Sequence, residues 1–233
     1  AAQGVEWALA TGASVFEGGA AIVEEEEEEE DEDEAEQRRR VAQDMASMSL
    51  FDACKNGKTD VVQAWLDSGA DANSPTDAQG RTPLFIACVE GHVDAARLLL
   101  DNGAEVDRAD QYGYTPLFIA CWKGHVDAAR LLLQQGADVN RARKNGQTPL
   151  HLVCLEGHVD AARLLLDNGA EVDRAMNNGA TPLHIVCHEG HVDAARLLLS
   201  KGAEVNRAMK DGATPLLIAC QNGHVDAARL LLE

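Results

Sequence analysis

The sequence predicts an all-α fold, an α-solenoid of paired short helices that follows a disordered, acidic N-terminal segment. One observation is a ten-residue segment, Gly-His-Val-Asp-Ala-Ala-Arg-Leu-Leu-Leu, that occurs five times without change, beginning at Gly91, Gly124, Gly157, Gly190 and Gly223. A second is the tripeptide Thr-Pro-Leu, which recurs at Thr82, Thr115, Thr148, Thr181 and Thr214. Successive copies of both lie 33 residues apart. A fixed period of this length is typical of stacked repeats rather than of one globular core.

The first helix of each unit has clear start and stop signals, as residues 110–142 illustrate. Thr115 can cap a helix with its hydroxyl, and Pro116 occupies the first helical position, where its missing N–H is no loss. We therefore expect a short helix from about Pro116 to Lys123. Gly124 ends it, because glycine adopts the left-handed conformation that other residues resist.

The second helix of the unit starts near Val126 and ends at Gly136. Asp127 lies in its first turn, where the helix dipole favours a carboxylate. Its inward-facing residues are Ala128, Ala129, Leu131 and Leu132. Two short helices cannot bury their own apolar side, so each buried leucine contributes its about 1.5–3 kcal/mol only when a neighbouring unit covers it.

These features together resemble a known family, the ankyrin repeat: the period of 33 residues, Thr-Pro-Leu-His at Thr148 and Thr181, Gly-His between the helices, and Leu-Leu-Leu-x-x-Gly-Ala after them. The resemblance covers Met48 to Glu233. We predict an ankyrin repeat domain over residues 47–233, with about six repeats, the last of them truncated. The resemblance implies that the extended segment after each helix pair forms a projecting hairpin and that the chain recognises a protein.

The two ends of the array differ from its middle. The first repeat begins near Met48, lacks Thr-Pro-Leu, and has Lys58 where the others have His and Asp52 where they have Ile or Leu. Because one face of an end repeat meets water, these polar residues predict an N-terminal capping repeat. At the other end the sequence stops at Glu233, inside a second helix, so we expect the natural protein to continue.

The net charge of −19 is concentrated near the N-terminus. Residues 1–46 hold 15 acidic and 3 basic side chains, and eleven acids run without interruption from Glu24 to Glu34. Such a block repels itself and stays solvated, so we expect residues 1–46 to be disordered. The acidity argues against nucleic acid as a partner, since a phosphate backbone is bound through Lys and Arg. Capture of a basic protein by this segment remains an alternative to a purely solvating role.

Six cysteines occur once per repeat, at one place in the first helix: Cys54, Cys88, Cys121, Cys154, Cys187 and Cys220. Neighbouring helices pack about 8–10 Å apart, whereas a disulfide needs Cα atoms about 4.4–6.8 Å apart. We therefore expect reduced, buried, structural thiols. Core thiols, together with the lack of a signal peptide or an apolar run of spanning length, favour the cytoplasm or nucleus and no membrane partner.

Two local motifs suggest chemistry but are better explained by the repeat. Gly-Lys-Thr at Gly57 resembles a phosphate-binding loop, yet the position five residues earlier is Asp52 rather than glycine. A second group has metal-like spacing: His184, Cys187, His188 and His191. All but His188 recur as repeat positions, and the Gly-His histidines form a ladder typical of framework. We predict no cofactor, no metal and no catalytic residue, and hence no enzyme.

The recognition surface is expected where the repeats differ. In ankyrin-like stacks, the hairpin tips and the exposed side of the first helix form a concave face. The chain has two tyrosines and three tryptophans, and Tyr112, Tyr114 and Trp122 all fall on this face in the third repeat. Large aromatic side chains are enriched at interface hot spots. The predicted protein-binding residues are Arg81, Tyr112, Tyr114, Trp122, Lys123, Arg143 and Lys144. Alternatively, the tyrosines pack between hairpins and Trp122 covers a neighbouring helix.

Four arginines in the extended segments form a second candidate surface: Arg108, Arg141, Arg174 and Arg207. They could hold an acidic partner, or they are solvated or locally paired.

The predicted function is therefore a monomeric, non-enzymatic scaffold that binds a protein partner through its concave face. One alternative is the targeting arm of a larger enzyme, of the kinase or ubiquitin ligase type, whose catalytic domain lies beyond Glu233. Another is that the acidic segment holds a basic partner while the repeats act as a rigid spacer.

Overall fold

A computed structural model describes residues 33–233, which fall into two compact units, one ending at residue 47 and one from residue 48 to residue 233. The first unit contains a helix over residues 33–47. Exposed charges pair along it, Arg38 with Glu34 and Arg40 with Glu36.

The prediction of disorder was wrong for the part of the N-terminal segment that forms this helix. We expected disorder as far as residue 46, whereas residues 33–46 are helical. The difference arises where the acidic run gives way to Ala, Gln and Arg, because these residues favour helix and place opposite charges four residues apart. The remainder of the segment, residues 1–32, lies outside the described residues, and so does most of the acidic run.

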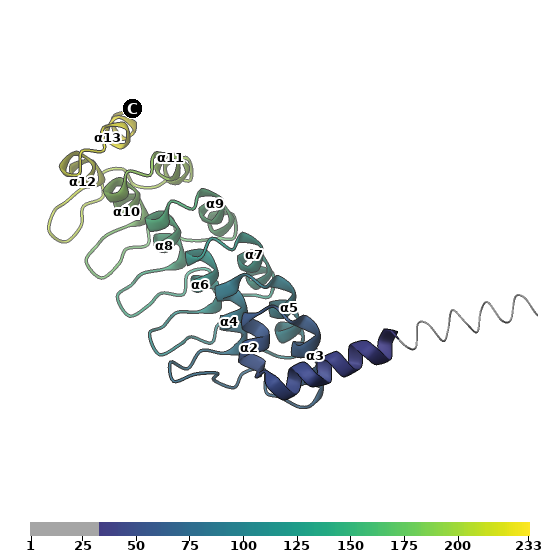
Figure 1. Cartoon of the computed structure of the whole chain (residues 1–233). Helices are drawn as coiled ribbons and strands as arrows, with labels where there is room; N and C mark the ends of the chain where they lie inside the picture. The colour runs from purple at the N-terminus through teal and green to yellow at the C-terminus, as the bar shows by residue number, and fades with distance from the viewer. Residues whose placement is uncertain (1–32) are drawn as a thin grey trace, which may run out of the picture. The chain divides into compact units, whose positions relative to one another are not determined.

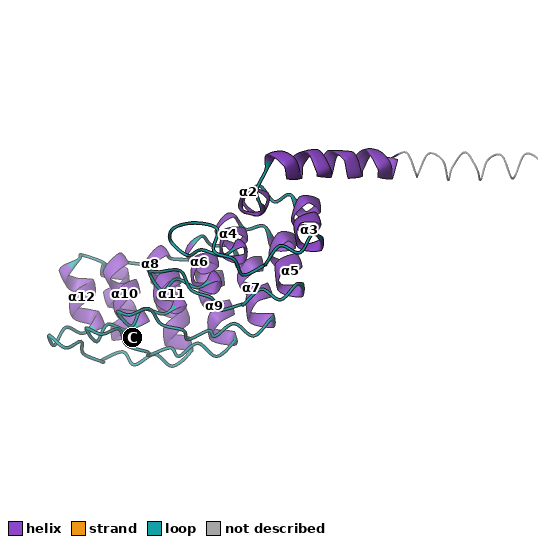
Figure 2. Cartoon of the chain, turned by 90° about the horizontal axis from the view of Figure 1, so that it is seen from below, coloured by secondary structure: helices purple, strands orange, loops and turns teal. Residues whose placement is uncertain are grey.

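The second unit is the predicted all-α stack of short helix pairs, arranged in two rows (Figure 1). The first row consists of α2 (Leu50–Lys55), α4 (Pro83–Glu90), α6 (Pro116–Trp122), α8 (Pro149–Glu156), α10 (Pro182–Glu189) and α12 (Pro215–Gln221). The second row consists of α3 (Thr59–Asp67), α5 (Val93–Asp101), α7 (Val126–Gln134), α9 (Val159–Asp167), α11 (Val192–Ser200) and α13 (Val225–Leu232). Each helix packs against its neighbours in its own row and against its partner in the other row. Long loops extend from the first row, away from the second (Figure 1). Figure 2 shows the same helices and loops from below.

The first-row helices begin as the sequence predicts. Thr115 Oγ1 accepts a hydrogen bond from the backbone N–H of Phe118 at 3.1 Å, and Pro116 occupies the first helical position. Helix α6 ends at Trp122, one residue earlier than expected, and Gly124 follows in the left-handed conformation with φ 72°. That conformation turns the chain directly into α7.

The apolar core lies between the rows and between the layers. In α7, Ala128, Ala129, Leu131 and Leu132 are buried, as predicted. Alanines bring the paired helices close, while Leu117 and Leu132 are fully buried and fill the space between layers. Each layer therefore depends on its neighbours to remove its leucines from water.

The histidine of the Gly-His junction joins consecutive layers. His92 Nε2 lies 3.1 Å from the carbonyl oxygen of Lys55, so the ring N–H donates across the layer boundary. The same hydrogen bond joins His125 to Val89, His191 to Leu155 and His224 to His188. The ring also lies against the junction glycine of the preceding layer, since a Cβ added at Gly91 would lie 2.7 Å from His125 Nδ1. The histidine ladder is framework, as predicted.

A second kind of histidine is buried at the start of α8 and α10. His151 Nδ1 accepts a hydrogen bond from the backbone N–H of Thr148 at 3.2 Å, and its Nε2–H donates to Ala180 O in the next hairpin at 3.3 Å. Burial lowers the pKa of His151 to about 4. His184 repeats the arrangement with Thr181 and Ala213, and burial lowers its pKa too.

The first repeat is capped differently from the others. Helix α2 starts after Ser49, whose hydroxyl accepts from the Asp52 N–H at 3.2 Å, while the Asp52 carboxylate accepts from the Ser49 N–H at 3.3 Å. Asp52 therefore completes a capping box, which explains its polar character more directly than exposure to water does.

All six cysteines are free thiols, and five of them are buried as expected. Burial raises the pKa of Cys54, Cys121 and Cys187 to about 12, so these thiols stay protonated. Cys220 is exposed, contrary to the expectation. Among residues 33–233, no first-row helix follows α12 to cover this side chain.

Candidate protein-binding site

The hairpin of the third repeat presents its two tyrosines on a fixed turn. The Asp110 carboxylate accepts from the backbone N–H groups of Tyr112 and Tyr114, both at 2.9 Å. Gly113 has φ 83°, a conformation that glycine adopts without strain. Gln111 N–H donates to Gln79 O in the preceding hairpin at 2.9 Å, so adjacent hairpins support one another.

Three aromatic rings meet between this hairpin and α6. The ring centroids of Tyr114 and Trp122 lie 5.9 Å apart in a stacked arrangement, with an interplanar angle of 25°. Phe118 meets Tyr114 edge-on, with 5.1 Å between the centroids. Phe118 is buried, so the rings form a ladder from the core to the surface.

Arg143, from the next hairpin, closes over this ladder. Its Cζ lies 3.9 Å from the Tyr114 ring centroid, and its Nε–H donates to Tyr112 O at 3.4 Å. Its Nη1–H donates to Gln147 Oε1 at 3.1 Å, which fixes the guanidinium. Lys123 Nζ lies 5.6 Å from the Trp122 ring centroid. Both are cation–π distances. We call Tyr112, Tyr114, Trp122, Lys123 and Arg143 the cation–aromatic cluster.

The members of the cluster differ in exposure. The exposed fraction is 55% for Tyr112 and 38% for Trp122. Tyr114 is half-buried, because Phe118 and Arg143 cover much of its ring. Tyr114 thus has the packing role that the alternative interpretation gave to both tyrosines, whereas Tyr112 and Trp122 face solvent.

Two predicted site residues, Arg81 and Lys144, form no side-chain hydrogen bond, ion pair or ring contact with the cluster. Arg81 pairs with Asp77 and donates to Gln79 Oε1 at 3.5 Å, all within the second repeat's hairpin. Lys144 is exposed, and within residues 33–233 its side chain makes no hydrogen bond or ion pair. Its backbone carbonyl accepts from Asn177 Nδ2 at 2.9 Å. The structure thus brings together five of the seven predicted residues.

Sequence reasoning missed two supporting residues, Phe118 and Gln147. Phe118 occupies the position that holds histidine in Thr-Pro-Leu-His, and its buried ring packs edge-on against the Tyr114 ring. Gln147 follows Arg143 by four residues across one hairpin, a spacing that could have indicated the hydrogen bond between them.

The arginines of the extended segments are mostly paired locally. Arg108, Arg174 and Arg207 each pair with the glutamate three residues earlier. Arg141 lacks that glutamate, since Asp138 stands in its place. The Asp138 carboxylate accepts from the Asn140 N–H at 2.9 Å, and Arg141 forms no ion pair within the part of the chain that the structure describes.

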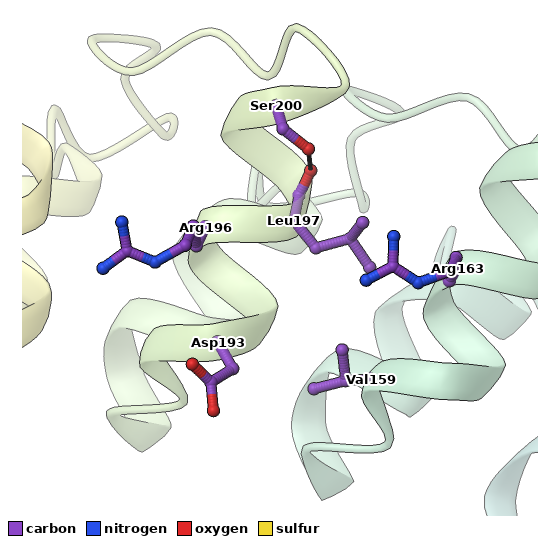
Figure 3. Close-up of a pocket in the computed structure, with 6 residues that line it drawn as sticks. All are labelled: Val159, Arg163, Asp193, Arg196, Leu197 and Ser200. Carbon is purple, nitrogen blue, oxygen red and sulfur yellow. Dashed lines mark hydrogen bonds between the residues drawn. The ribbon is translucent and has the colours of Figure 1, made fainter.

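Shallow grooves occur between neighbouring second-row helices. Figure 3 shows one of about 480 Å³ between α9 and α11, lined by Val159, Arg163, Asp193, Arg196, Leu197 and Ser200. An equivalent groove lies one layer earlier. Since most of these side chains belong to the segment that recurs five times, this face hardly distinguishes one layer from the next.

The residues with metal-like spacing have separate structural roles. Cys187 is buried in the core, His184 contacts Thr181 and Ala213, and His191 bonds to Leu155 O. Across residues 33–233, no group of three or more histidine, cysteine or acidic residues is arranged to hold a metal ion. No helix in this region is long and apolar enough to cross a membrane.

Comparison with protein-family models gives a match to ankyrin repeats, in three copies over residues 50–143, 141–209 and 173–233. These overlapping matches span most of the chain and include the whole cation–aromatic cluster. A comparison with curated proteins finds no match.

Proposed function

The chain belongs to the ankyrin-repeat family, and we propose that it is a non-enzymatic scaffold that binds a protein partner through its hairpin tips and first-row helices. Ankyrin repeats are in general protein-interaction modules. In this chain the proposed contact is centred on the cation–aromatic cluster, with Lys144 beside it and Arg81 at its edge. The compartment we propose is reducing, the cytoplasm or nucleus, because the buried thiols are unpaired.

The exposure of two aromatic side chains on a rigid support carries this proposal. Tyr112 and Trp122 are the exposed large aromatic side chains of the described region. Burying such a side chain against a partner removes a large apolar area from water, and its polar atom stays available for a hydrogen bond. Truncation of a residue of this kind costs about 2 kcal/mol or more at an interface hot spot.

The exposed aromatic side chains of the cluster are held in place before any partner binds. The Asp110 hydrogen bonds fix the backbone of Tyr112, and the stack on Tyr114 limits the rotamers of Trp122. A partner would therefore lose little free energy in ordering these side chains, which leaves more of the contact energy as affinity.

The experiment is affinity capture from a lysate of the source organism with the immobilised full chain. A parallel capture uses the double variant Tyr112→Ala, Trp122→Ala, which leaves Tyr114 and its packing intact. We expect proteins captured by the original chain and lost from the variant. Each is then purified and titrated, with an expected rise in Kd of at least about thirtyfold, the equivalent of about 2 kcal/mol.

The matched control is Leu217→Ala, Val225→Ala, which removes exposed apolar side chains outside the cluster. It should capture the same proteins as the original chain. Equal capture by the original chain and by the Tyr112, Trp122 variant would remove the cluster from the proposed interface. Circular dichroism of all three proteins checks that each is folded.

A further inference from the structure

Cations without carboxylate partners gather around the cation–aromatic cluster. Lys123, Arg143 and Lys144 form no ion pair within residues 33–233, and neither does Arg141 two residues before Arg143. Elsewhere in the extended segments the arginines are neutralised, as Arg108 is by Glu105. Within residues 33–233, the third and fourth repeats therefore present positive charge that no carboxylate pairs with.

The position of Arg143 explains why this charge is free. The second and third repeats have Asp77 and Asp110 at the equivalent place, and each carboxylate caps its own hairpin. In the fourth repeat the hairpin is capped by a neutral side chain, since Asn145 Oδ1 accepts from the Gln147 N–H at 3.1 Å. Position 143 is thus released from capping, and its arginine extends over Tyr114 of the preceding repeat.

From these observations we propose that the cation–aromatic cluster, together with the neighbouring Lys144, binds an acidic peptide segment of the partner protein, with carboxylates at Lys123, Arg143 and Lys144 and an apolar side chain on Tyr112 and Trp122. This inference rests on the proposed function and names the chemistry of its partner. A carboxylate can accept two parallel hydrogen bonds from a guanidinium held in place. The guanidinium of Arg143 is held in place by its hydrogen bond to Gln147 Oε1 and by its contact with the Tyr114 ring.

The surroundings favour a short acidic segment over a nucleic acid. Glu90 and Glu156 occupy the place of Lys123 in the two adjacent repeats, and both are exposed. A long polyphosphate would meet these carboxylates on either side. The Tyr114 and Trp122 rings already have cations over them, which leaves less ring surface for stacked bases.

The test measures binding of fluorescein-labelled synthetic peptides to the full chain by anisotropy. The probe is an unstructured peptide of alternating acidic and Gly or Ser residues with two leucines, and its partner peptide has Gln for Glu and Asn for Asp. We expect the acidic peptide to bind, and the neutral one to bind at least about tenfold more weakly. The Kd of the acidic peptide should rise with sodium chloride, since exposed ion pairs are screened by salt.

The decisive variant is Lys123→Gln, Arg143→Gln, Lys144→Gln, and the matched control is Arg97→Gln, Arg163→Gln, Arg196→Gln on the second-row helices. Both remove three positive charges, so they alter the net charge equally. We expect at least a tenfold loss of affinity in the first and less than a threefold loss in the second.

The inference would be overturned by equal binding of acidic and neutral peptides, by equal losses in the two variants, or by tighter binding of a single-stranded oligonucleotide than of the acidic peptide. Absence of peptide binding would overturn it as well. The proposed function would stand in each case if lysate capture still depended on Tyr112 and Trp122, so the two can fail separately.

Discussion

His151 shows how one residue can join two repeats and make their contact sensitive to pH. Its ring accepts at Nδ1 from Thr148 and donates at Nε2 to Ala180 in the next hairpin. The bond from Thr148 requires the neutral ring, because a protonated Nδ1 could not accept. Burial acts in the same direction and lowers the pKa of His151 to about 4. Phe85 and Phe118 occupy the equivalent place in two other repeats, which shows that an uncharged ring fits there.

We predict that His151→Phe reduces the pH dependence of stability. In the original chain the folded pKa of about 4 lies below the ordinary value of about 6.5. The stabilisation by the neutral ring is therefore complete above pH 6.5 and is lost as the pH falls towards 4. Between pH 7 and pH 5 this residue should lower the free energy of unfolding by about 2 kcal/mol. Urea denaturation of both proteins at the two pH values measures the difference.

Exposed His188 supplies the control for this prediction. The loss of stability between pH 7 and pH 5 should persist in His188→Gln, since the buried His151 remains in that variant. If His151→Phe lost as much stability between pH 7 and pH 5 as the original chain, His151 would not be the responsible group.

At the scale of the helix, the sequence predicted those features that local chemistry decides. Thr115, Pro116 and Gly124 marked the limits of α6 to within one residue, because capping and backbone conformation are properties of a few neighbouring residues. The burial of Leu131 and Leu132 followed from helical periodicity. The solvent-facing positions of Tyr112 and Trp122 followed from the 33-residue register, which placed them at a hairpin tip and at a helix end.

Features that depend on contacts between repeats could not be read from the sequence. The approach of Arg143 to Tyr114 depends on the distance and angle between the hairpins of the fourth and third repeats. Arg81 was expected beside the cluster, but its nearest carboxylate, Asp77, binds it within its own hairpin. The helix over residues 33–47 was missed because the acidic run dominated the composition.

The junction between two helices gives a prediction at this same scale. Gly157 ends α8 with φ 73°, and a Cβ there would lie 2.9 Å from the His191 ring. Gly169 has φ 87°, yet nothing lies within 4 Å of its Cβ position. We predict that Gly169→Ala costs about 1–2 kcal/mol for its left-handed conformation. Gly157→Ala should cost about 1–3 kcal/mol more, because the His191 ring must shift.

Thermal or urea unfolding of the two alanine variants tests this comparison. The larger loss at Gly157 should be accompanied by weaker amide protection around Leu155, whose carbonyl accepts the His191 hydrogen bond. Equal losses at the two glycines would mean that backbone conformation alone requires glycine in the junction.

On the scale of the whole unit, residues 48–233 behave as a series of nearly interchangeable layers. Each helix contacts its partner and the same-row helices of adjacent layers. The Gly-His hydrogen bond repeats with the same geometry at several boundaries. Stability is then expected as a sum of layer and boundary contributions rather than as a property of one core. The cation–aromatic cluster is different, since it exists only where the third and fourth repeats meet.

This arrangement predicts that deletion of one repeat can preserve the fold while binding depends on which repeat is removed. Deletion of residues 176–208 joins Ala175 to Met209 in the 33-residue register, and Ala213 then takes the place of Ala180 as acceptor for His151. The chain should stay folded, with partner affinity within about threefold of the original, because the cluster and both its flanking layers remain.

Deletion of residues 143–175 keeps the register equally well but replaces Arg143 by Met176 at the contact with Tyr114. That protein should show the same helical circular dichroism as the first deletion and yet bind the partner at least about tenfold more weakly. Unfolding of both proteins would show that the layers are not independent. Equal, undiminished binding by both would show that the partner depends neither on Arg143 nor on the other residues that distinguish the fourth repeat from the fifth.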